Sequence, residues 1–404
     1  MIVRPAERRA IGAVFLLFGT DMGTFASRLP WIADRLHLTS GLLGVSVGLM
    51  TAIGAVVTIP FAARLVHRYG PRASTRVLIL ACGATLPLPA LAPSTITLCA
   101  SMLLIGGVYG TCDNAINAQA VEAERRAGRS IMSGLHGMWS LGVLAGALAG
   151  SLAARVHVDP RVQFTVLGAL IAVGGVVATA WFISTPPIDD QAAAEAPRFV
   201  WPRGIILAIG LVGFAAIFVE TAGNDWSAVY LHWVLHASQA QAALATGLFA
   251  GSMAAGRLSG DAVIRRVGPR LCVRICGLLG TGGCVLVAVS ESAGVALAGF
   301  ALIGVGVSVV IPVVFAAAGN SGPSPALGVA GVATISYGAG LVAPSAIGGI
   351  ANVSSLRVAF AVAALVAFLV AVGAGLLQRP LRPAAGPEPA VEHATEEAVR
   401  RRSA

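Results

Sequence analysis

Charged residues are scarce in this chain, and lysine is absent altogether. Only 11% of its 404 residues are charged, against about 25% in a typical soluble protein, while 56% are hydrophobic. All 27 basic residues are arginines. This composition excludes a soluble globular domain and indicates a membrane protein.

Residue sets that hold metals or nucleotides are also missing. The six cysteines fall inside or at the ends of apolar runs without neighbouring histidine or carboxylate ligands, so we expect buried hydrophobes and no metal site. No nucleotide-binding loop of the Walker type is present. No basic helix face with stacking aromatics accompanies the net charge of +9, which argues against nucleic-acid binding. No nucleophile–base pair lies at one depth to support an enzyme.

Long apolar runs are what the chain has in abundance. Runs of about 20 residues, enough to cross a hydrocarbon core about 30 Å thick, alternate with short polar turns. They lie at about 9–31, 41–64, 74–92, 95–119, 131–154, 162–183, 204–230, 238–260, 271–290, 293–318, 326–350 and 356–378. We therefore predict an all-α membrane protein with twelve transmembrane helices, embedded in a lipid bilayer.

A polar, Pro-rich stretch divides the chain near its middle. We expect an N-terminal six-helix bundle (1–183), a cytoplasmic linker (184–203), a C-terminal six-helix bundle (204–378) and a disordered cytoplasmic tail (379–404). The stretches LVHRYGPR and VIRRVGPR recur at an offset of 198, and GTFAS and GNDWS at an offset of 200. Two matching halves around a site near midplane are the parallel-repeat architecture of secondary transporters.

The arginines predict the orientation of the chain. Twenty-two lie on one side of the predicted spans, with Arg257 assigned to the turn after the eighth span, and five lie on the other. By the positive-inside rule, both termini and the linker are cytoplasmic, in a multi-pass protein of the bacterial plasma (inner) membrane.

Five stretches carry a resemblance to a known family. They are SRLP (27–30), DNAINAQAVEAERRAGRSIMSGLHGMWSLG (113–142), ETAGNDWSAVYL (220–231), GRLSGD (256–261) and SYGAGLVAPSAIGGIA (336–351). Together they resemble the major facilitator superfamily, in a subgroup similar to the MosC/YbjJ-like transporters near the fucose-permease-like branch. The resemblance implies two pseudo-symmetric six-helix bundles that transport a solute by alternating access.

The turns after the second and eighth spans look like the family's loop signature. The resemblance implies a gating role for their basic and glycine residues, although His67 and Arg265 stand where an acid is usual. These residues are Arg68, Gly70, Arg72, Arg266, Gly268 and Arg270.

Three acids within the predicted spans are candidates for proton coupling. Asp113 and Asp21 lie near midplane, and Glu220 lies on the outer half of the seventh span. A charged group at helix centre costs roughly 2.5–3.5 kcal/mol, so such residues usually face a protein interior or a water-filled path. Fucose–proton symporters carry their coupling acid at the place of Asp113, and the resemblance implies that role here. Structural hydrogen bonding within a bundle is the alternative for each acid.

Six polar or aromatic residues are candidates for solute binding: Asn114, Asn117, His136, Trp139, Asn224 and Tyr337. Amides both donate and accept, which suits a hydroxyl-rich solute, and His136 lies at a depth where it can meet Asn117. Trp139 either stacks on a sugar face or fills the core. Hydrogen bonding between helices is the alternative for the amides.

We expect a monomeric secondary transporter of a small polar solute, resembling a sugar, polyol or amino sugar, which uses the proton gradient and no cofactor. The alternative is proton-driven export of a metabolite or antibiotic. Gly142, Gly146 and Gly150 form a small-residue stripe like that of drug exporters. Ala147 and Ser151 stand where those exporters carry proline and glycine, which disfavours the alternative.

Overall fold

The computed structural model describes residues 5–127, 131–182, 203–319, 321 and 325–377, which form helices joined by short turns, with no β-strand among them. Eleven helical segments in these ranges are long and apolar enough to cross a membrane. The helix at the place of the remaining predicted span, α11 (Gln239–Val267), has 29 residues but is less apolar, since it begins with glutamines and contains Arg257.

The helices follow the predicted spans in order. The first half contains α1 (Pro5–Ser27), α2 (Leu29–Arg35), α3 (Ser40–Leu43), the π-helix η1 (Gly44–Leu49), α4 (Met50–Thr85), α5 (Leu88–Leu91), α6 (Thr95–Ala127), α7 (Met132–Arg155) and α8 (Pro160–Thr179). The second half contains α10 (Ile205–Leu235), α11, α12 (Pro269–Ala288), α13 (Ala293–Val307), α14 (Val310–Gly319), α15 (Pro325–Val353), α16 (Leu356–Gly373) and the 3-10 helix η2 (Ala374–Leu377).

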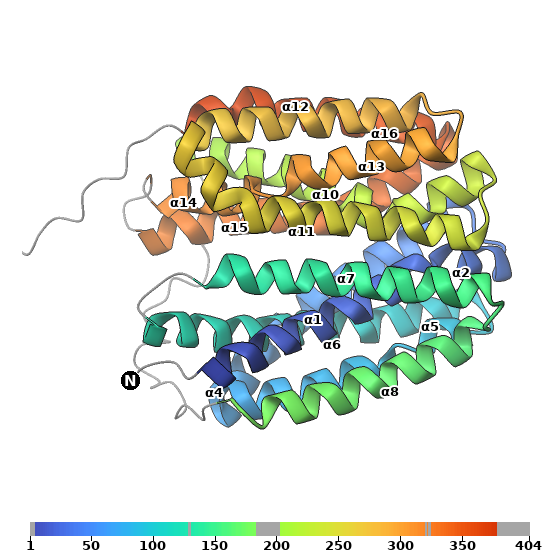
Figure 1. Ribbon diagram of the computed structural model, residues 1–404, viewed down its shortest axis with the longest axis horizontal. Coiled ribbons are helices and arrows are strands. Elements are labelled where there is room, and N and C mark those ends of the chain that lie inside the picture. The colour runs from blue at the N-terminus through green and yellow to red at the C-terminus, as the bar shows by residue number, and fades with distance from the viewer. Residues whose placement is uncertain (1–4, 128–130, 183–202, 320, 322–324, 378–404) are drawn as a thin grey trace, which may run out of the picture.

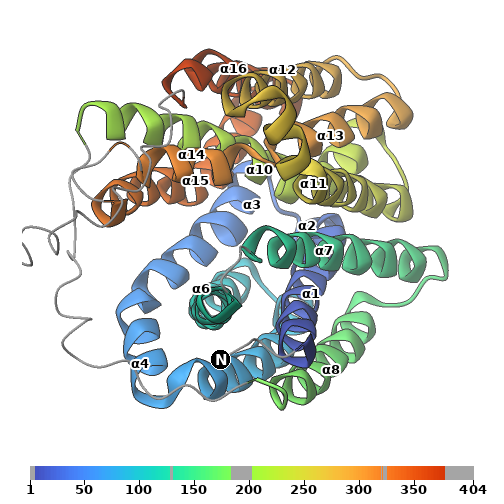
Figure 2. The ribbon, with the colours of Figure 1, turned by 60° about the vertical axis from the view of Figure 1, so that its left-hand side comes forward.

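The two halves form two bundles that lie side by side, the first below the second in Figure 1. This arrangement confirms the predicted fold class. The predicted linker, apart from Arg203, and the predicted tail lie outside the described residues. Figure 2 shows α6 between α4 on one side and α1 on the other.

Two glycines make equivalent sharp turns in the two halves. Gly70 breaks α4 with φ 77° and ψ 159°, and Gly268 separates α11 from α12 with φ 79° and ψ 157°. A positive φ is a conformation that glycine adopts without the steric cost of a Cβ. The same backbone, 198 residues apart, supports the sequence repeat and explains why the glycine recurs in both basic turns.

Three further turns share a pattern that the sequence analysis did not recognise. His37, His157 and His236 each end a helix in the left-handed conformation, with φ of 51°, 56° and 52°. Each is followed by one apolar residue and then by a cap, Thr39, Asp159 or Ser238, whose side chain accepts a backbone N–H of the next helix. The turns after α2, α7 and α10 are therefore built alike.

Small residues bring α1 and α7 close together, as the predicted stripe requires. A Cβ at Gly142 would lie 2.0 Å from the carbonyl oxygen of Leu16, and one at Gly146 would lie 2.3 Å from that of Thr20. Gly19 fits in the same way against the carbonyl oxygen of Trp139. The glycine stripe thus serves packing inside the first bundle.

The halves touch mainly in two regions. One lies along α7 and α11, and the other lies at the end of the molecule where α2 is found, on the right in Figure 1. We call this end the α2 end. Ser151 on α7 donates to the carbonyl oxygen of Ala240 on α11 over 2.8 Å. On η1, a Cβ at Gly48 would lie 1.9 Å from the Cβ of Pro344 on α15. The helix α6, by contrast, packs almost entirely against its own half.

Candidate functional site

An arginine links the two halves near the middle of the helices. Arg257 on α11 donates through Nη2 to Glu220 Oε1 on α10, over 3.0 Å. Through Nη1 it donates to Ser140 Oγ on α7, over 2.9 Å. Side-chain exposure is 14% for Arg257 and 20% for Glu220, so both groups are largely shielded yet keep an accessible edge. A charge pair at this depth is costly unless its members satisfy each other.

This geometry corrects two statements drawn from the sequence. Arg257 does not lie in a turn: α11 continues for ten residues beyond it, to Val267, which is about 15 Å of helix. Glu220 does not lie on the outer half of its span but at the middle of the 31-residue α10. Both placements follow from helices that extend past their apolar segments.

Two predicted residues of α7 surround the arginine. The Cζ atom of Arg257 lies 5.9 Å from the ring centroid of Trp139, within the range of a cation–π contact. The ring of His136 packs edge-on against Phe15 of α1, with centroids 5.4 Å apart. His136 makes no ring hydrogen bond to the described residues, and its imidazole is partly exposed. The helices that carry His136 and Asn117, α7 and α6, pack little against each other.

Asn224 lies one turn beyond Glu220 on α10. Its Nδ2 donates to Asp225 Oδ1 over 3.0 Å, and its buried Oδ1 has no hydrogen-bond partner among the described residues. Because residues four apart share a helix face, Asn224 continues the polar stripe that begins at Glu220. The candidate for solute binding in α15, Tyr337, has a side chain outside the described residues.

Asp113 has an exposed side chain on α6. Asn117 Nδ2 donates to its carboxylate over 3.1 Å, while the side chain of Asp113 remains exposed. Asp113 lies nine residues beyond the exposed Leu104, which is two and a half helical turns, so the two point in opposite directions. It also lies between the face of α6 where Tyr109 reaches α1 and the face where Gly110 meets α4. The carboxylate therefore points away from the lipid-facing stripe of α6.

The neighbouring amide, Asn114, is also exposed. Its Nδ2 donates to the carbonyl oxygen of Gly110 over 2.7 Å, within its own helix. Asp113 and Asn117 thus share a face, as predicted, while Asn114 is turned by about 100°.

Asp21, the other predicted acid of the first half, is enclosed. Its side chain is 0% exposed, and its Oδ1 accepts a hydrogen bond from the hydroxyl of Tyr109 on α6. Its Oδ2 has no partner among the described residues. Phe18 packs against Tyr109 with ring centroids 5.5 Å apart and covers the pair. The surroundings of Asp21 are those of a structural acid within one bundle.

The predicted loop residues occupy the twin turns at the end of the molecule opposite the α2 end. Arg72 donates to the carbonyl oxygen of Ala180 over 3.1 Å, which ties the turn to the end of α8. The Cζ atom of Arg68 lies 5.5 Å from the ring of Tyr69, and Arg266 is exposed. The contact of Arg72 holds the first turn against its own bundle.

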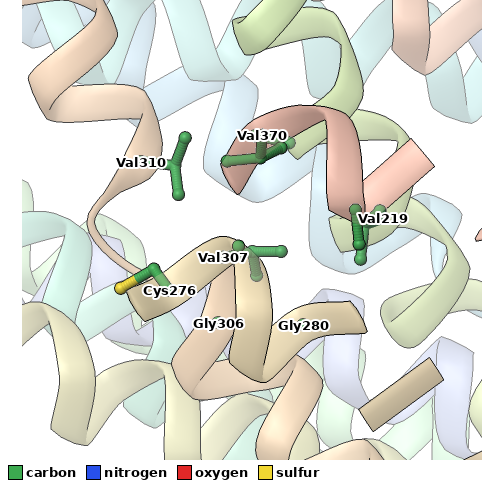
Figure 3. Close-up of a pocket in the computed structure, with 10 residues that line it drawn as sticks. Val219, Cys276, Gly280, Gly306, Val307, Val310 and Val370 are labelled. Atoms are coloured by element: carbon green, nitrogen blue, oxygen red, sulfur yellow. The ribbon is translucent and has the colours of Figure 1, made fainter. Parts of the chain in front are cut away.

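A small pocket lies elsewhere, within the second bundle (Figure 3). Its lining is apolar and includes Val219, Cys276, Val307, Val310 and Val370. No polar side chain in this lining is available to orient a polar solute, so the pocket is separate from the polar site between the halves.

Sequence reasoning missed the arginine, the serine and the tyrosine of these clusters. Arg257 was assigned to a turn because basic residues usually mark the ends of spans. A signal was present, since Arg257, in the stretch GRLSGD, lies eight residues before Arg265, the next arginine in the chain. Nothing local marks Ser140 or Tyr109, whose partners lie 117 and 88 residues away.

Comparison with known proteins identifies the family. The model of the Major Facilitator Superfamily matches residues 11–343 and 214–403. An uncharacterised MFS-type transporter of Yersinia pestis is 35% identical over 373 residues, covering 90% of this chain and 94% of that protein. The uncharacterised transporter y4wD of Sinorhizobium fredii is 32% identical over 372 residues, covering 92% and 98%. Membrane protein MosC of Rhizobium meliloti is 29% identical over 375 residues, covering 91% and 89%.

Solved structures share the fold at low sequence identity. The nucleoside transporter NupG matches with a TM-score of 0.69 at 13% identity, over 92% of this chain and 100% of that chain. A bacterial homologue of the human lysosomal transporter Spinster, in an inward-facing and occupied conformation, matches with a TM-score of 0.62 at 14% identity, over 92% and 96%. On this evidence the chain belongs to the major facilitator superfamily and is a multi-pass membrane transporter, not an enzyme.

Proposed function

We propose that the protein is a proton-coupled secondary transporter that moves a small polar solute by alternating access. The observation that carries this proposal is the link from Arg257 to Glu220 and Ser140, in which a charge pair of the second half reaches a serine of the first half near the middle of the helices. Such charges persist inside a membrane protein where they line a binding site or a water-filled path. In our proposal the solute binds beside this link.

The groups around the link suit a hydroxylated ring. Glu220 and Asn224 offer acceptors on one helix face, Arg257 offers donors, and His136 offers a ring nitrogen. Trp139 supplies an aromatic surface for the apolar face of a sugar or of a nucleobase. This set supports a sugar, polyol, amino sugar or nucleoside as the solute. The nucleoside class enters because NupG, which shares the fold, is a nucleoside transporter.

We assign proton coupling to Asp113. Its side chain is exposed while that of Asp21 is fully enclosed, and a coupling acid must reach water to exchange its proton. Asn117 hydrogen-bonds the carboxylate and can hold it in place through both protonation states. Glu220 is already paired with Arg257, which makes it better suited to solute binding than to proton carriage.

The two halves are in contact at the α2 end, and α6 packs almost entirely against its own half. Both observations support a state that opens at the end opposite to α2. The arginine distribution predicts that this opposite end is cytoplasmic. In our proposal the protein is therefore in an inward-facing state. Rocking of the two bundles closes the opposite end and opens the α2 end.

A binding screen followed by a transport assay tests the proposal. Purified protein is screened by thermal shift against sugars, polyols, amino sugars, nucleosides and common antibiotics, because a ligand that binds the folded state raises the melting temperature. The best ligand is then assayed in proteoliposomes under an imposed pH gradient of either sign. Uptake with the proton gradient supports symport, and movement against it supports the export alternative.

The Asp113→Asn variant tests the coupling residue. We expect it to lose gradient-driven accumulation and to keep exchange of labelled for unlabelled solute, because exchange needs the binding site but no net proton movement. Accumulation equal to that of the wild type would reject the role of Asp113. Loss of exchange together with accumulation would assign Asp113 to solute binding instead.

A further inference from the structure

A second polar cluster joins the halves, at the α2 end and apart from the proposed solute site. Asp34 on α2 accepts hydrogen bonds from two residues of α10, His232 Nε2 over 2.7 Å and Trp233 Nε1 over 3.0 Å. Gln239 Nε2, at the start of α11, lies 3.5 Å from the same carboxylate. One carboxylate of the first half is thus held by three side chains of the second half.

Both ring nitrogens of His232 face oxygen acceptors. Nε2 faces Asp34 Oδ2, and Nδ1 lies 2.9 Å from the carbonyl oxygen of Ala237. A neutral imidazole carries one N–H and can donate to only one of these oxygens. The imidazolium carries two, so the protonated ring fits both acceptors and turns the bond to Asp34 into a charge-assisted one.

The groups packed around His232 leave Asp34 as its ionic partner among the described residues. Arg35, next to Asp34 on α2, donates instead to backbone carbonyls of its own half. On α10, His236 follows one turn later and is exposed. On α11, Gln239 Nε2 lies 3.3 Å from His232 Nε2 and contributes no charge. The charge of the ring is therefore set by the proton it holds and by one carboxylate.

The cluster lies where the halves meet. Beside it, a Cβ at Gly41 on α3 would lie 3.2 Å from the Cβ of Asn352 on α15. A Cβ at Gly348 on α15 would lie 2.6 Å from the carbonyl oxygen of Ser40. Separation of the halves at the α2 end would break the three contacts to Asp34 together.

We propose that His232 and Asp34 form a latch operated by a proton. The imidazolium form of His232 satisfies both acceptors and holds the α2 end closed, whereas the neutral form satisfies only one and favours opening of this end. Histidine is the side chain whose charge ordinarily changes between about pH 5 and pH 8. The arginine distribution predicts that this end lies on the outer side of the membrane, where the external pH acts on it directly. The latch rests on the proposed transport function, since it regulates which end opens. Opening of the α2 end is measured without a solute, so the latch can fail while the assignment of the solute stands.

Two exposed positions flank the junction and suit spin labels: Leu42 on α3 is 47% exposed, and Val353 at the end of α15 is 85% exposed. The labels are attached to cysteines at these positions in a Cys99→Ser background, because the other five native cysteines are buried. Distances are measured by double electron–electron resonance in lipid nanodiscs at about pH 5.5 and about pH 8. We expect one short distance at the lower pH and a longer-distance fraction that grows about fivefold at the higher pH, the effect of losing one charge-assisted hydrogen bond.

Two variants and one control locate the sensor. His232→Gln and Asp34→Asn each remove the ion pair, and both should give the same distances at both pH values. His236→Asn removes a neighbouring exposed histidine and keeps the left-handed backbone that asparagine tolerates, so it should respond as the wild type does. A wild type with identical distances at both pH values overturns the latch, as does a response that survives both variants. A response lost only in His236→Asn would also overturn it.

Discussion

Arg257 and Glu220, on neighbouring helices of the second half, share a hydrogen-bonded ion pair of 3.0 Å that also reaches Ser140 of the first half. Removing one partner of a shielded pair leaves an uncompensated charge, which is worse than removing both. The pair therefore predicts strong coupling between substitutions at the two sites.

We expect Arg257→Gln and Glu220→Gln each to lower stability by about 2–4 kcal/mol and the double variant to lose less than the sum, with a coupling free energy of about 1–3 kcal/mol. The measurement is thermal or denaturant unfolding of the four proteins in the same detergent. Additive losses would show that the pair contributes no coupling. Normal transport by either single variant would show that the pair is not part of the solute site.

The hydrogen bond from Tyr109 to Asp21 predicts a structural role that can be separated from proton coupling. Tyr109→Phe leaves the enclosed carboxyl group without a partner, and we expect a loss of about 1–3 kcal/mol. Asp21→Asn keeps an oxygen that accepts from Tyr109, and we expect it to retain accumulation driven by a pH gradient. Comparison of Asp21→Asn with Asp113→Asn in the same proteoliposomes checks this, and failure of both to accumulate solute would make Asp21 a second coupling acid.

The close packing of α1 on α7 predicts opposite effects of alanine at two glycines of one helix. Gly142→Ala places a methyl group 2.0 Å from the carbonyl oxygen of Leu16, and we expect a loss of about 1–3 kcal/mol as the helices shift. Gly134→Ala meets no atom within 4 Å and should be neutral or stabilising by about 0.4–1 kcal/mol. Unfolding midpoints of the two variants measure this difference, and equal midpoints would contradict the packing.

A buried ion pair fastens the start of α1 to the end of α6. Arg126 Nη2 donates to Glu7 Oε1 over 2.7 Å, and Glu7 is 1% exposed. We expect Glu7→Gln to cost about 2 kcal/mol, since Arg126 keeps a second partner in Glu122. Arg125→Gln is the control, because that side chain is 78% exposed and its pair with Glu122 should contribute less than about 1 kcal/mol. A similar effect of both substitutions on the unfolding midpoint would contradict this assignment.

The order and approximate limits of the helices could be predicted because each span must bury about 20 apolar residues in lipid. The close approach of α7 to another helix could also be predicted from the spacing of Gly142 and Gly146, although not that α1 is the partner. The basic turns recur with glycines at the same offset, and their backbone conformations agree within a few degrees.

The pairing of side chains across helices could not be predicted. Arg257 lies ten residues inside α11 because that helix extends past its apolar part, and hydropathy alone does not define such an end. Asp34, His232 and Trp233 meet only when the two bundles come together, so no local pattern marks them. The contact of His136 with Phe15 likewise depends on how α1 packs against α7.

The three turns that end in left-handed histidines bear on how the protein is made. In each, the histidine, one apolar residue and a capping residue fix the reversal of the chain within a few positions. A reversal specified so locally needs no distant partner, so the chain can change direction as soon as the two flanking segments have been made. The chain is thus suited to enter the bilayer with these three reversals already set, and the contacts between distant helices assemble afterwards.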